Sequence, residues 1–322
     1  MRYPTIKDII IAQQRIKDHL EVTPLHSYPM LNELLGAEVY VKHENYQPTG
    51  AFKIRGGLNL VSQLTQEEKE RGVITASTGN HGQSIALAGE IFGVDARVCV
   101  PEKSNPVKLV AMRHYGAEII EYGKDFDEAR LNAEKLSKEY GYRYIHSGNE
   151  PLLIAGVGTI GLEILQQQPD VEIIFSPVGA GTGCGGTAIA AKSIDSEVKI
   201  IAVQAENAPS VYMSWKSGEL ESSESADTMA DGLATRQAFS LPTSILREWV
   251  DGFSLVSEDE IRLGIRKYLE LCHTVAEGAG AAPLAAAIKM KDTIEGKKVA
   301  LVLSGGNLDY VTLKGIIEAS KR

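Results

Sequence analysis

The chain has 322 residues and a formal net charge of −9, with 43% hydrophobic and 23% charged residues. These values are typical of a globular protein that buries a large core in one long or two fused domains. The negative charge disfavours nonspecific binding to nucleic acid or to an anionic membrane surface. No apolar run reaches the about 20 residues of a membrane span, and the first residues lack the apolar segment of a signal peptide. We therefore expect a cytoplasmic protein.

Predicted strands and helices alternate along most of the chain. The N-terminal helix begins with a capping box, Thr5 to Asp8, followed by apolar residues at helical spacing. Further helices are predicted at about 53–64, 81–92, 105–115, 125–140, 155–167, 186–192 and 258–272. Strands are predicted at 39–44, 73–76, 96–100, 118–122, 143–146, 171–176, 198–204, 253–256 and 298–303. This alternation predicts an α/β fold with parallel sheets flanked by helices.

Lys53 is the first candidate for chemistry. It stands between Gly50 and Gly56, next to Phe52 and Ile54, shortly after a predicted strand. Apolar neighbours favour the neutral form of a lysine amine, and a neutral amine is a nucleophile towards carbonyls. On local composition alone the favoured alternative is a surface lysine whose stem lies along an apolar patch.

Four glycine-rich turns are predicted to follow strands, at 77–82, 179–186, 276–280 and 304–307. The first opens a helix, whose backbone N–H groups and dipole suit a small anion such as a substrate carboxylate. The second has few side chains to block the approach of a phosphate. Its Gly181, Gly183 and Gly186 also match G-x-G-x-x-G, so this stretch alone leaves a nicotinamide-dependent dehydrogenase open. The third turn contributes a carboxylate, Glu277, and the fourth a hydroxyl, Ser304.

Metal chemistry has no support in the sequence. The histidines show no spacing typical of metal ligands. The three cysteines are widely separated and indicate neither a disulfide framework nor a zinc site.

The motifs at 52–56, 77–82, 179–183 and 304–307 together resemble the serine/threonine dehydratases of fold-type II, which use pyridoxal phosphate and include serine racemase. The resemblance covers about residues 6 to 317. It implies a large cofactor-binding domain of residues 1–71 and 150–322 and a smaller, substrate-side domain of residues 72–149. In this family the glycine-rich loop holds a single phosphate, which makes the dehydrogenase a distant alternative.

The resemblance also implies roles for individual residues. Lys53 would bind the cofactor covalently beside Phe52 and later move the Cα proton, while Thr78 would be the second catalytic residue. The cofactor would be held further by Asn80 at its ring oxygen, Ser304 at its pyridine nitrogen, Glu277, and the phosphate loop Gly179, Ala180, Gly181, Thr182 and Gly183. The substrate would be bound by Ser77, Thr78, Gly79, His81 and Gly148.

The activity that the resemblance implies is elimination of ammonia from L-threonine, L-serine or a related β-hydroxy amino acid, with release of a 2-oxo acid. A hydroxyl at the ring nitrogen makes a weak electron sink and favours elimination over transamination. The alternatives are a serine or aspartate racemase, a hydroxyaspartate dehydratase and a β-replacement enzyme such as cysteine synthase. Thr78 stands where the racemases have a serine, and its extra methyl group narrows the pocket. The intact Lys53 and glycine-rich turns argue against a non-catalytic relative.

Three further expectations follow from departures from the family pattern and from chain length. Gln204 and Ser210 stand where the family's divalent-cation site has acidic residues, so we expect no metal there. The loop from His146 to Glu150 lacks the phenylalanine and aspartate typical of threonine dehydratases, which leaves the substrate side chain open. One helix after Asn307 leaves no length for a C-terminal regulatory domain. A homodimer is expected by resemblance.

Overall fold

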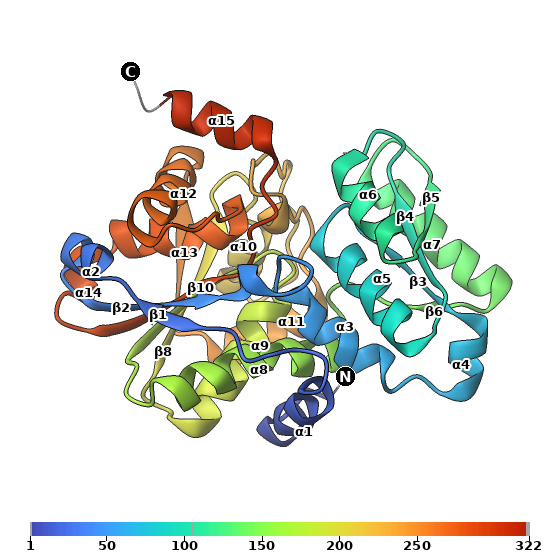
Figure 1. Cartoon of the computed structure of the whole chain (residues 1–322), viewed down its shortest axis with the longest axis horizontal. Helices are drawn as coiled ribbons and strands as arrows, with labels where there is room; N and C mark the ends of the chain where they lie inside the picture. Colours follow the sequence, from blue (N-terminus) through green and yellow to red (C-terminus); the bar gives the residue numbers. More distant parts are fainter. Residues whose placement is uncertain (1, 105, 320–322) are drawn as a thin grey trace.

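The computed structural model describes residues 2–104 and 106–319 (Figure 1). Within these residues the strands form two sheets, one of order β1-β2-β10-β7-β8-β9 and one of order β5-β4-β3-β6. Neighbouring strands are parallel throughout, except for the antiparallel pair β1 and β2. The predicted α/β architecture with parallel sheets is therefore confirmed.

Most of the predicted strands and helices are present, together with several elements that were not predicted. The strands are β1 (Leu25–Ser27), β2 (Glu38–His43), β3 (Val73–Ala76), β4 (Ala96–Val100), β5 (Glu118–Glu121), β6 (Arg143–Tyr144), β7 (Ile173–Pro177), β8 (Lys199–Ala205), β9 (Gly252–Val256) and β10 (Lys298–Leu303). The α-helices are α1 (Ile6–Ile16), α2 (Pro29–Leu35), α3 (Lys53–Val61), α4 (Gln66–Arg71), α5 (Asn80–Phe92), α6 (Pro106–His114), α7 (Phe126–Tyr140), α8 (Pro151–Gln167), α9 (Thr182–Ile194), α10 (Ser210–Ser217), α11 (Ser240–Trp249), α12 (Glu258–Cys272), α13 (Gly278–Lys289), α14 (Lys291–Ile294) and α15 (Tyr310–Ala319). Two short 3₁₀ helices, η1 (Glu44–Tyr46) and η2 (Asp231–Leu233), complete the described elements.

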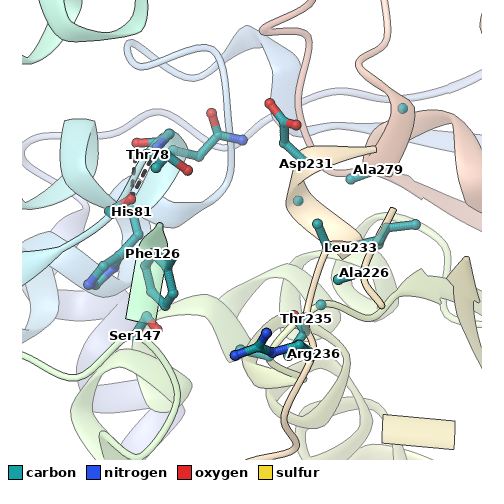
Figure 2. A pocket seen from close by; sticks show the side chains of 18 of the residues that line it. Thr78, His81, Phe126, Ser147, Ala226, Asp231, Leu233, Thr235, Arg236 and Ala279 are labelled. Atoms are coloured by element: carbon teal, nitrogen blue, oxygen red, sulfur yellow. Dashed lines mark hydrogen bonds between the residues drawn. The ribbon is translucent and has the colours of Figure 1, made fainter. Parts of the chain in front are cut away.

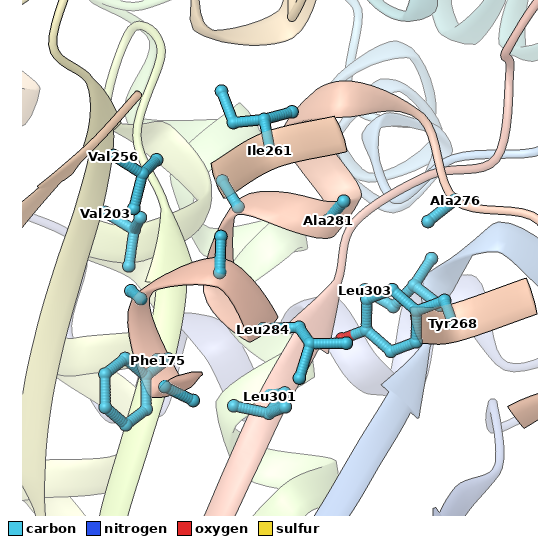
Figure 3. Close-up of a cluster of buried hydrophobic side chains, with 14 of the residues drawn as sticks. Phe175, Val203, Val256, Ile261, Tyr268, Ala276, Ala281, Leu284, Leu301 and Leu303 are labelled. Carbon is cyan, nitrogen blue, oxygen red and sulfur yellow. The ribbon is translucent and has the colours of Figure 1, made fainter. Parts of the chain in front are cut away.

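Strand β10 shows how the larger sheet is buried on both faces. Leu301 and Leu303 pack into the cluster that includes residues of α12 and α13, which Figure 3 shows from close by. Ala300 and Val302 face the opposite way, into the cluster that includes residues of α8 and α9. Successive side chains of a strand point to opposite faces, so an almost continuous apolar run is what such a central parallel strand needs.

The smaller sheet, built from residues 73–144, is covered in the same way. Val73 and Val98 pack into a cluster with residues of α5 and α6, whereas Ile74 and Cys99 pack with Ala129 and Ala133 of α7. This sheet lies within residues 72–149, the range of the predicted smaller domain, and the division into domains stays a prediction.

Helix α3 lies between α5 and α8 and connects the two halves of the molecule (Figure 1). Its two glycines make this close packing possible. A Cβ atom at Gly57 would lie 2.3 Å from the Ser84 hydroxyl oxygen, and one at Gly56 would lie 3.0 Å from the Leu153 carbonyl oxygen. The glycines after Lys53 therefore serve to seat the helix that carries this lysine.

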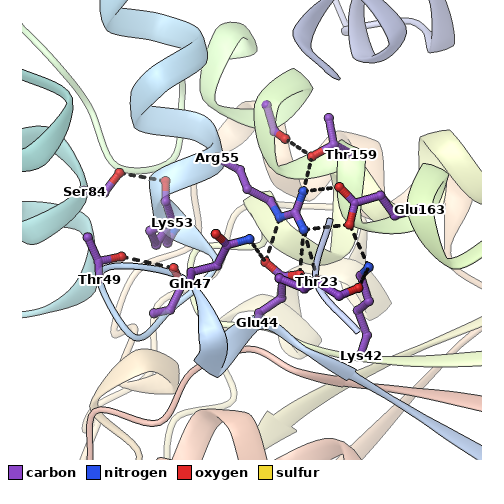
Figure 4. A network of polar contacts seen from close by, with 12 residues as sticks. Thr23, Lys42, Glu44, Gln47, Thr49, Lys53, Arg55, Ser84, Thr159 and Glu163 are labelled. Carbon is purple, nitrogen blue, oxygen red and sulfur yellow. Dashed lines mark hydrogen bonds and ion pairs between the residues drawn. The ribbon is translucent and has the colours of Figure 1, made fainter. Parts of the chain in front are cut away.

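A buried network of charges fixes the other side of α3 (Figure 4). The Arg55 guanidinium pairs with the carboxylates of Glu44 at 2.7 Å and Glu163 at 2.6 Å, and the Lys42 amine also binds Glu163 at 2.6 Å. Burial alone would lower the pKa of Arg55, but the two carboxylates hold it above its ordinary value. Two cations and two carboxylates compensate one another, which is what burial of such groups requires.

Several element starts differ from the predictions. Helix α8 begins at Pro151 rather than at about 155, and α9 begins at Thr182, inside the glycine-rich stretch, rather than at 186. Close packing of α9 on α8 explains the second difference, because a Cβ at Gly186 would lie 2.6 Å from the Ile154 carbonyl oxygen. The predicted helix start at residue 105 falls outside the described residues, and α6 begins at Pro106.

The stretch 276–280 was wrongly predicted as a turn after a strand. It follows helix α12, and its Gly278 begins helix α13. Residues of α13 from Gly278 to Ala287 are buried, so the helix lacks the polar face that would have indicated its period. Helices α2, α4, α10, α11 and α14 and strand β1 were also not predicted. In the described part of the chain, no helix has both the length and the apolar composition of a membrane span.

Candidate active site

A cavity of about 1120 Å³ lies where the glycine-rich turns of both sheets meet. Ser77 follows β3, Gly179 follows the end of β7, and Ser304 follows β10, so the cavity lies at the carboxyl ends of parallel strands. The predicted site residues that line it are Phe52, Lys53, Ser77, Thr78, Gly79, Asn80, His81, Gly179, Ala180, Gly181, Thr182, Gly183, Glu277 and Ser304. Figure 2 shows part of the wall, with Thr78 and His81 opposite Asp231 and Leu233.

Gly148 is the predicted site residue that does not line this cavity. Its neighbour Ser147 does, whereas a Cβ at Gly148 would lie 2.5 Å from the Phe239 ring. The ring of His146 also packs edge-on against Phe239, with centroids 4.7 Å apart. The loop therefore needs a glycine at 148 to admit Phe239, and the proposed contact of Gly148 with substrate stays a prediction.

Lys53 is the first residue of α3 and is held on both sides. The Phe52 N–H donates to the Ser304 carbonyl oxygen at 3.0 Å, and the Ser84 hydroxyl donates to the Lys53 carbonyl oxygen at 2.7 Å. The Lys53 amine donates to the Thr182 hydroxyl oxygen at 2.9 Å. Burial lowers the pKa of Lys53 to about 8, so far more of the amine is neutral near pH 7 than in an ordinary lysine, although most of it is still protonated. The surface-lysine alternative is excluded.

The loop before α9 forms a cradle that larger side chains would fill. A Cβ at Gly179 would lie 2.1 Å from the Gly232 carbonyl oxygen, and one at Gly183 would lie 2.8 Å from the Phe52 ring. Gly181 has φ of 90°, a left-handed conformation that glycine adopts readily. The loop leads into the N-terminus of a 13-residue helix, and its backbone N–H groups suit a phosphate.

The start of α5 forms a second polar corner of the cavity. The Ser77 hydroxyl oxygen accepts hydrogen bonds from the N–H groups of Gly79 at 3.2 Å and Gly82 at 2.9 Å. These contacts fix the turn that presents Thr78, Asn80 and His81 to the cavity. Backbone N–H groups at a helix start attract a carboxylate.

His81 is a neutral residue in this corner. The Thr75 hydroxyl donates to the Ile145 carbonyl oxygen at 2.8 Å and lies 3.0 Å from His81 Nε2, so we assign the proton of the His81 ring to Nε2. Burial, with smaller effects of Lys53 and His146, lowers the pKa of His81 to about 3. His81 therefore contributes no charge to the cavity at neutral pH.

Glu277 and Asn80 are joined in a chain that includes Asn307. Asn80 Nδ2 donates to Glu277 Oε1 at 2.8 Å, and Asn307 Nδ2 donates to Asn80 Oδ1 at 2.8 Å. Asn307 also donates to the Thr49 carbonyl oxygen at 2.8 Å. These hydrogen bonds fix the orientation of the Asn80 amide, with Nδ2 towards Glu277 and Oδ1 towards Asn307. Sequence analysis did not assign Asn307 to the site, although it closes the turn at 304–307.

Several cations of the cavity rim have acidic partners. Lys108 of α6 pairs with Asp231 of η2, and Arg236 pairs with Asp127 of α7. Both pairs join an element that packs on the smaller sheet to the segment between β8 and α11. Arg130 pairs with Glu134 at 2.6 Å.

An amine of lowered pKa beside a glycine-rich anion cradle, at the carboxyl ends of parallel strands, is typical of an α/β enzyme with a phosphorylated carbonyl cofactor. A family model described as pyridoxal-phosphate dependent enzyme matches residues 16–305. The chain belongs to this family of pyridoxal-phosphate dependent enzymes. The observed cradle and the Lys53 amine fit the phosphate and the aldehyde of that cofactor.

The chain is similar to several known proteins along nearly its whole length. It is 42% identical to the L-threonine ammonia-lyase of Thermotoga maritima, over 99% of this chain and 80% of the relative. It is 37% identical to a catabolic L-threonine dehydratase of Staphylococcus aureus, over 98% of this chain and 92% of the relative. Among solved structures, serine racemase from Dictyostelium discoideum superposes with a TM-score of 0.89 at 37% identity, over 95% of this chain and 99% of that chain.

Proposed function

We propose that this protein is an ammonia-lyase that converts L-threonine or L-serine to a 2-oxo acid and ammonia. The observation that carries the proposal is the half-buried Lys53 side chain, whose amine is placed between the cradle before α9 and the polar corner at the start of α5. Bound pyridoxal phosphate would supply an electron sink for the negative charge that develops at the substrate Cα. The similarity to L-threonine ammonia-lyases supports the choice of substrate.

Each group of cavity residues would have a separate role in binding or catalysis. The loop from Gly179 to Gly183 would hold the phosphate, and the Ser304 hydroxyl would face the pyridine nitrogen. The start of α5 would bind the substrate carboxylate, which orients the Cα–H bond towards Lys53. Lys53, with its pKa of about 8, would accept the Cα proton at Nζ. Glu277 would hold the Asn80 amide ready for the cofactor's ring oxygen.

The charged side chains at the cavity rim help to indicate which β-hydroxy amino acid is the substrate. Lys108, Arg130 and Arg236 are each paired with an acidic residue. These three paired cations would attract a second substrate carboxylate only weakly, which is consistent with threonine or serine as the substrate. A homodimer and a cytoplasmic location are further parts of the proposal, carried from the family resemblance.

The test is a visible spectrum of the purified protein, followed by addition of L-threonine and an assay for 2-oxobutyrate. We expect a yellow protein whose band changes with threonine and which releases the oxo acid. Lys53→Ala should bind the cofactor without a covalent bond and lose turnover. A yellow protein that leaves threonine and serine unchanged would refute the substrate. Oxo-acid formation by Lys53→Ala at the wild-type rate would refute the role of the lysine.

Racemisation is a second candidate because Thr78 places an exposed hydroxyl at the cavity wall. A hydroxyl there can move a proton on the substrate face opposite Lys53, but the branched side chain of threonine is stiff at χ1. We expect slow formation of D-serine from L-serine by the wild type and faster formation by Thr78→Ser, measured by chiral chromatography. Equal rates for the two proteins would exclude this role of residue 78.

A further inference from the structure

In the loop from Gly179 to Gly183, Thr182 is the residue that has a side-chain hydroxyl. It begins helix α9 and is 2% exposed. A phosphate in the cradle is held by backbone N–H groups, which every residue of the loop supplies. The phosphate site therefore does not by itself require a side-chain hydroxyl at 182. That hydroxyl instead lies 2.9 Å from the Lys53 amine.

We infer that Thr182 is a positioning residue, which holds the Lys53 amine whenever that amine is free by accepting one of its N–H hydrogens. The inference rests on the proposed function, in which Lys53 is free while substrate is bound and moves the Cα proton. Among the described residues, the Thr182 hydroxyl is the only hydrogen-bond partner of the Lys53 amine.

The geometry explains why one acceptor matters. A neutral amine has two N–H groups and one lone pair on a flexible four-carbon stem. When Thr182 Oγ1 accepts one N–H, it limits rotation about the last carbon–nitrogen bond and leaves the lone pair available to the cavity. The Phe52 ring has its centroid 5.1 Å from Nζ and cannot direct the lone pair in this way. A base whose orientation is fixed before the reaction accepts the proton faster than a mobile base does.

The charges around Lys53 make the effect of Thr182 measurable. The titratable group that faces it is His81 of α5, which stays neutral because its pKa is about 3. Burial is the cause of the lowered pKa of Lys53 itself, about 8. An ammonium is a stronger hydrogen-bond donor than an amine, so Thr182 stabilises the charged form more. Removing the hydroxyl should lower the pKa of Lys53 further and also release the amine from its orientation.

Three variants separate this role from a structural one. Thr182→Val removes the hydroxyl and keeps the branched shape, while Thr182→Ser keeps the hydroxyl; both keep the backbone N–H that faces a phosphate. Thr187→Val is the matched control, because Thr187 lies on the same helix, is 0% exposed, and its hydroxyl has no hydrogen-bond partner among the described residues.

Two measurements are made on each protein. The first is the rate of covalent attachment of added pyridoxal phosphate to protein freed of cofactor, followed by absorbance against pH; it needs no amino-acid substrate. For Thr182→Val we expect the midpoint of the pH dependence of this attachment rate to fall by about half to one pH unit. The second is steady-state turnover of L-threonine, where we expect kcat to fall about tenfold with KM little changed. Thr187→Val should behave like the wild type in both measurements, and Thr182→Ser, which keeps the hydroxyl, should be clearly less impaired than Thr182→Val.

The inference is overturned if Thr182→Val keeps the wild-type midpoint and kcat, or if Thr182→Ser is as impaired as Thr182→Val. A failure of the proposed function looks different, because the wild type itself would then attach no cofactor or release no ammonia from threonine.

Discussion

The Glu277 carboxylate accepts a hydrogen bond of 2.8 Å from the amide nitrogen of Asn80, although the two residues are 197 positions apart in the chain. Glu277 stands at the start of α13 and Asn80 at the start of α5, so the bond joins the halves of the molecule across the cavity. Burial raises the pKa of Glu277 from 4.5, and the hydrogen bond from Asn80 opposes that rise. The charged form of Glu277 therefore makes the folded protein less stable than its protonated form does.

This cost predicts a pH dependence of stability. Because the folded pKa of Glu277 lies above its unfolded value, the folded protein binds this proton more tightly, and stability falls as pH rises from about 4.5 through the folded pKa. Glu277→Gln has no such proton. We expect its free energy of unfolding, relative to wild type, to increase from about pH 4 to pH 7 in urea titrations. Glu248→Gln, on an exposed position of α11, controls for the lost charge. A difference that does not change with pH would contradict the prediction.

The buried network around Arg55 predicts a large and non-additive loss of stability. Glu163→Gln leaves Lys42 and Arg55 with one carboxylate, Glu44, and should cost about 3–5 kcal/mol in the free energy of unfolding. Lys42→Met combined with Glu163→Gln removes one charge of each sign, so the double variant should lose less than the sum of the single variants. Urea unfolding measures all three.

The control for the network is Glu67→Gln, which removes an exposed ion pair with Arg71 and should change the free energy of unfolding by about 0–1 kcal/mol. Strictly additive losses for Lys42→Met and Glu163→Gln would show that the charges do not act as one network.

The cradle predicts the effect of one methyl group on cofactor affinity. The Cβ of Gly183→Ala would lie 2.8 Å from the Phe52 ring, and a shift of Phe52 moves the adjacent Lys53. We expect the Kd for pyridoxal phosphate to rise about tenfold or more, measured by titrating cofactor-free protein. Gly315→Ala on α15, where a Cβ meets open space, should leave the Kd unchanged. An unchanged Kd for Gly183→Ala would contradict this prediction.

The expectation of no metal at Gln204 and Ser210 is tested by a chelator. Gln204 Oε1 accepts from the Tyr212 N–H at 2.9 Å, and the Ser210 hydroxyl donates to the Thr235 carbonyl oxygen at 2.5 Å. Both side-chain oxygens are uncharged and already hydrogen-bonded, which makes a poor site for a hard cation. Incubation with EDTA should leave turnover of threonine unchanged. A loss that magnesium reverses would refute this prediction.

Local patterns predicted the elements whose amphipathic or capping signals are strong. The capping boxes at Thr5 and Ser257 form as expected, and β3, β4 and β10 have the predicted bounds. Helix α13 was missed because its residues are small and buried on all sides, so no polar face reveals its period. The start of α9 was misplaced because glycine usually ends a helix, whereas here it admits the neighbouring helix α8.

The sequence by itself determined the chemistry that is available: a lysine among apolar residues, four stretches rich in glycine, and strands apolar enough to be buried on both faces. These depend on neighbouring residues, whose effects a local pattern records. Only the tertiary structure decided that Thr182 meets Lys53 across 129 positions and that Asn307 meets Asn80 across 227. Such contacts depend on the order of strands in two sheets and on the packing of α3 between them, and a hydrogen bond needs its two atoms within about 3 Å. No local pattern fixes a distance of that kind between distant segments.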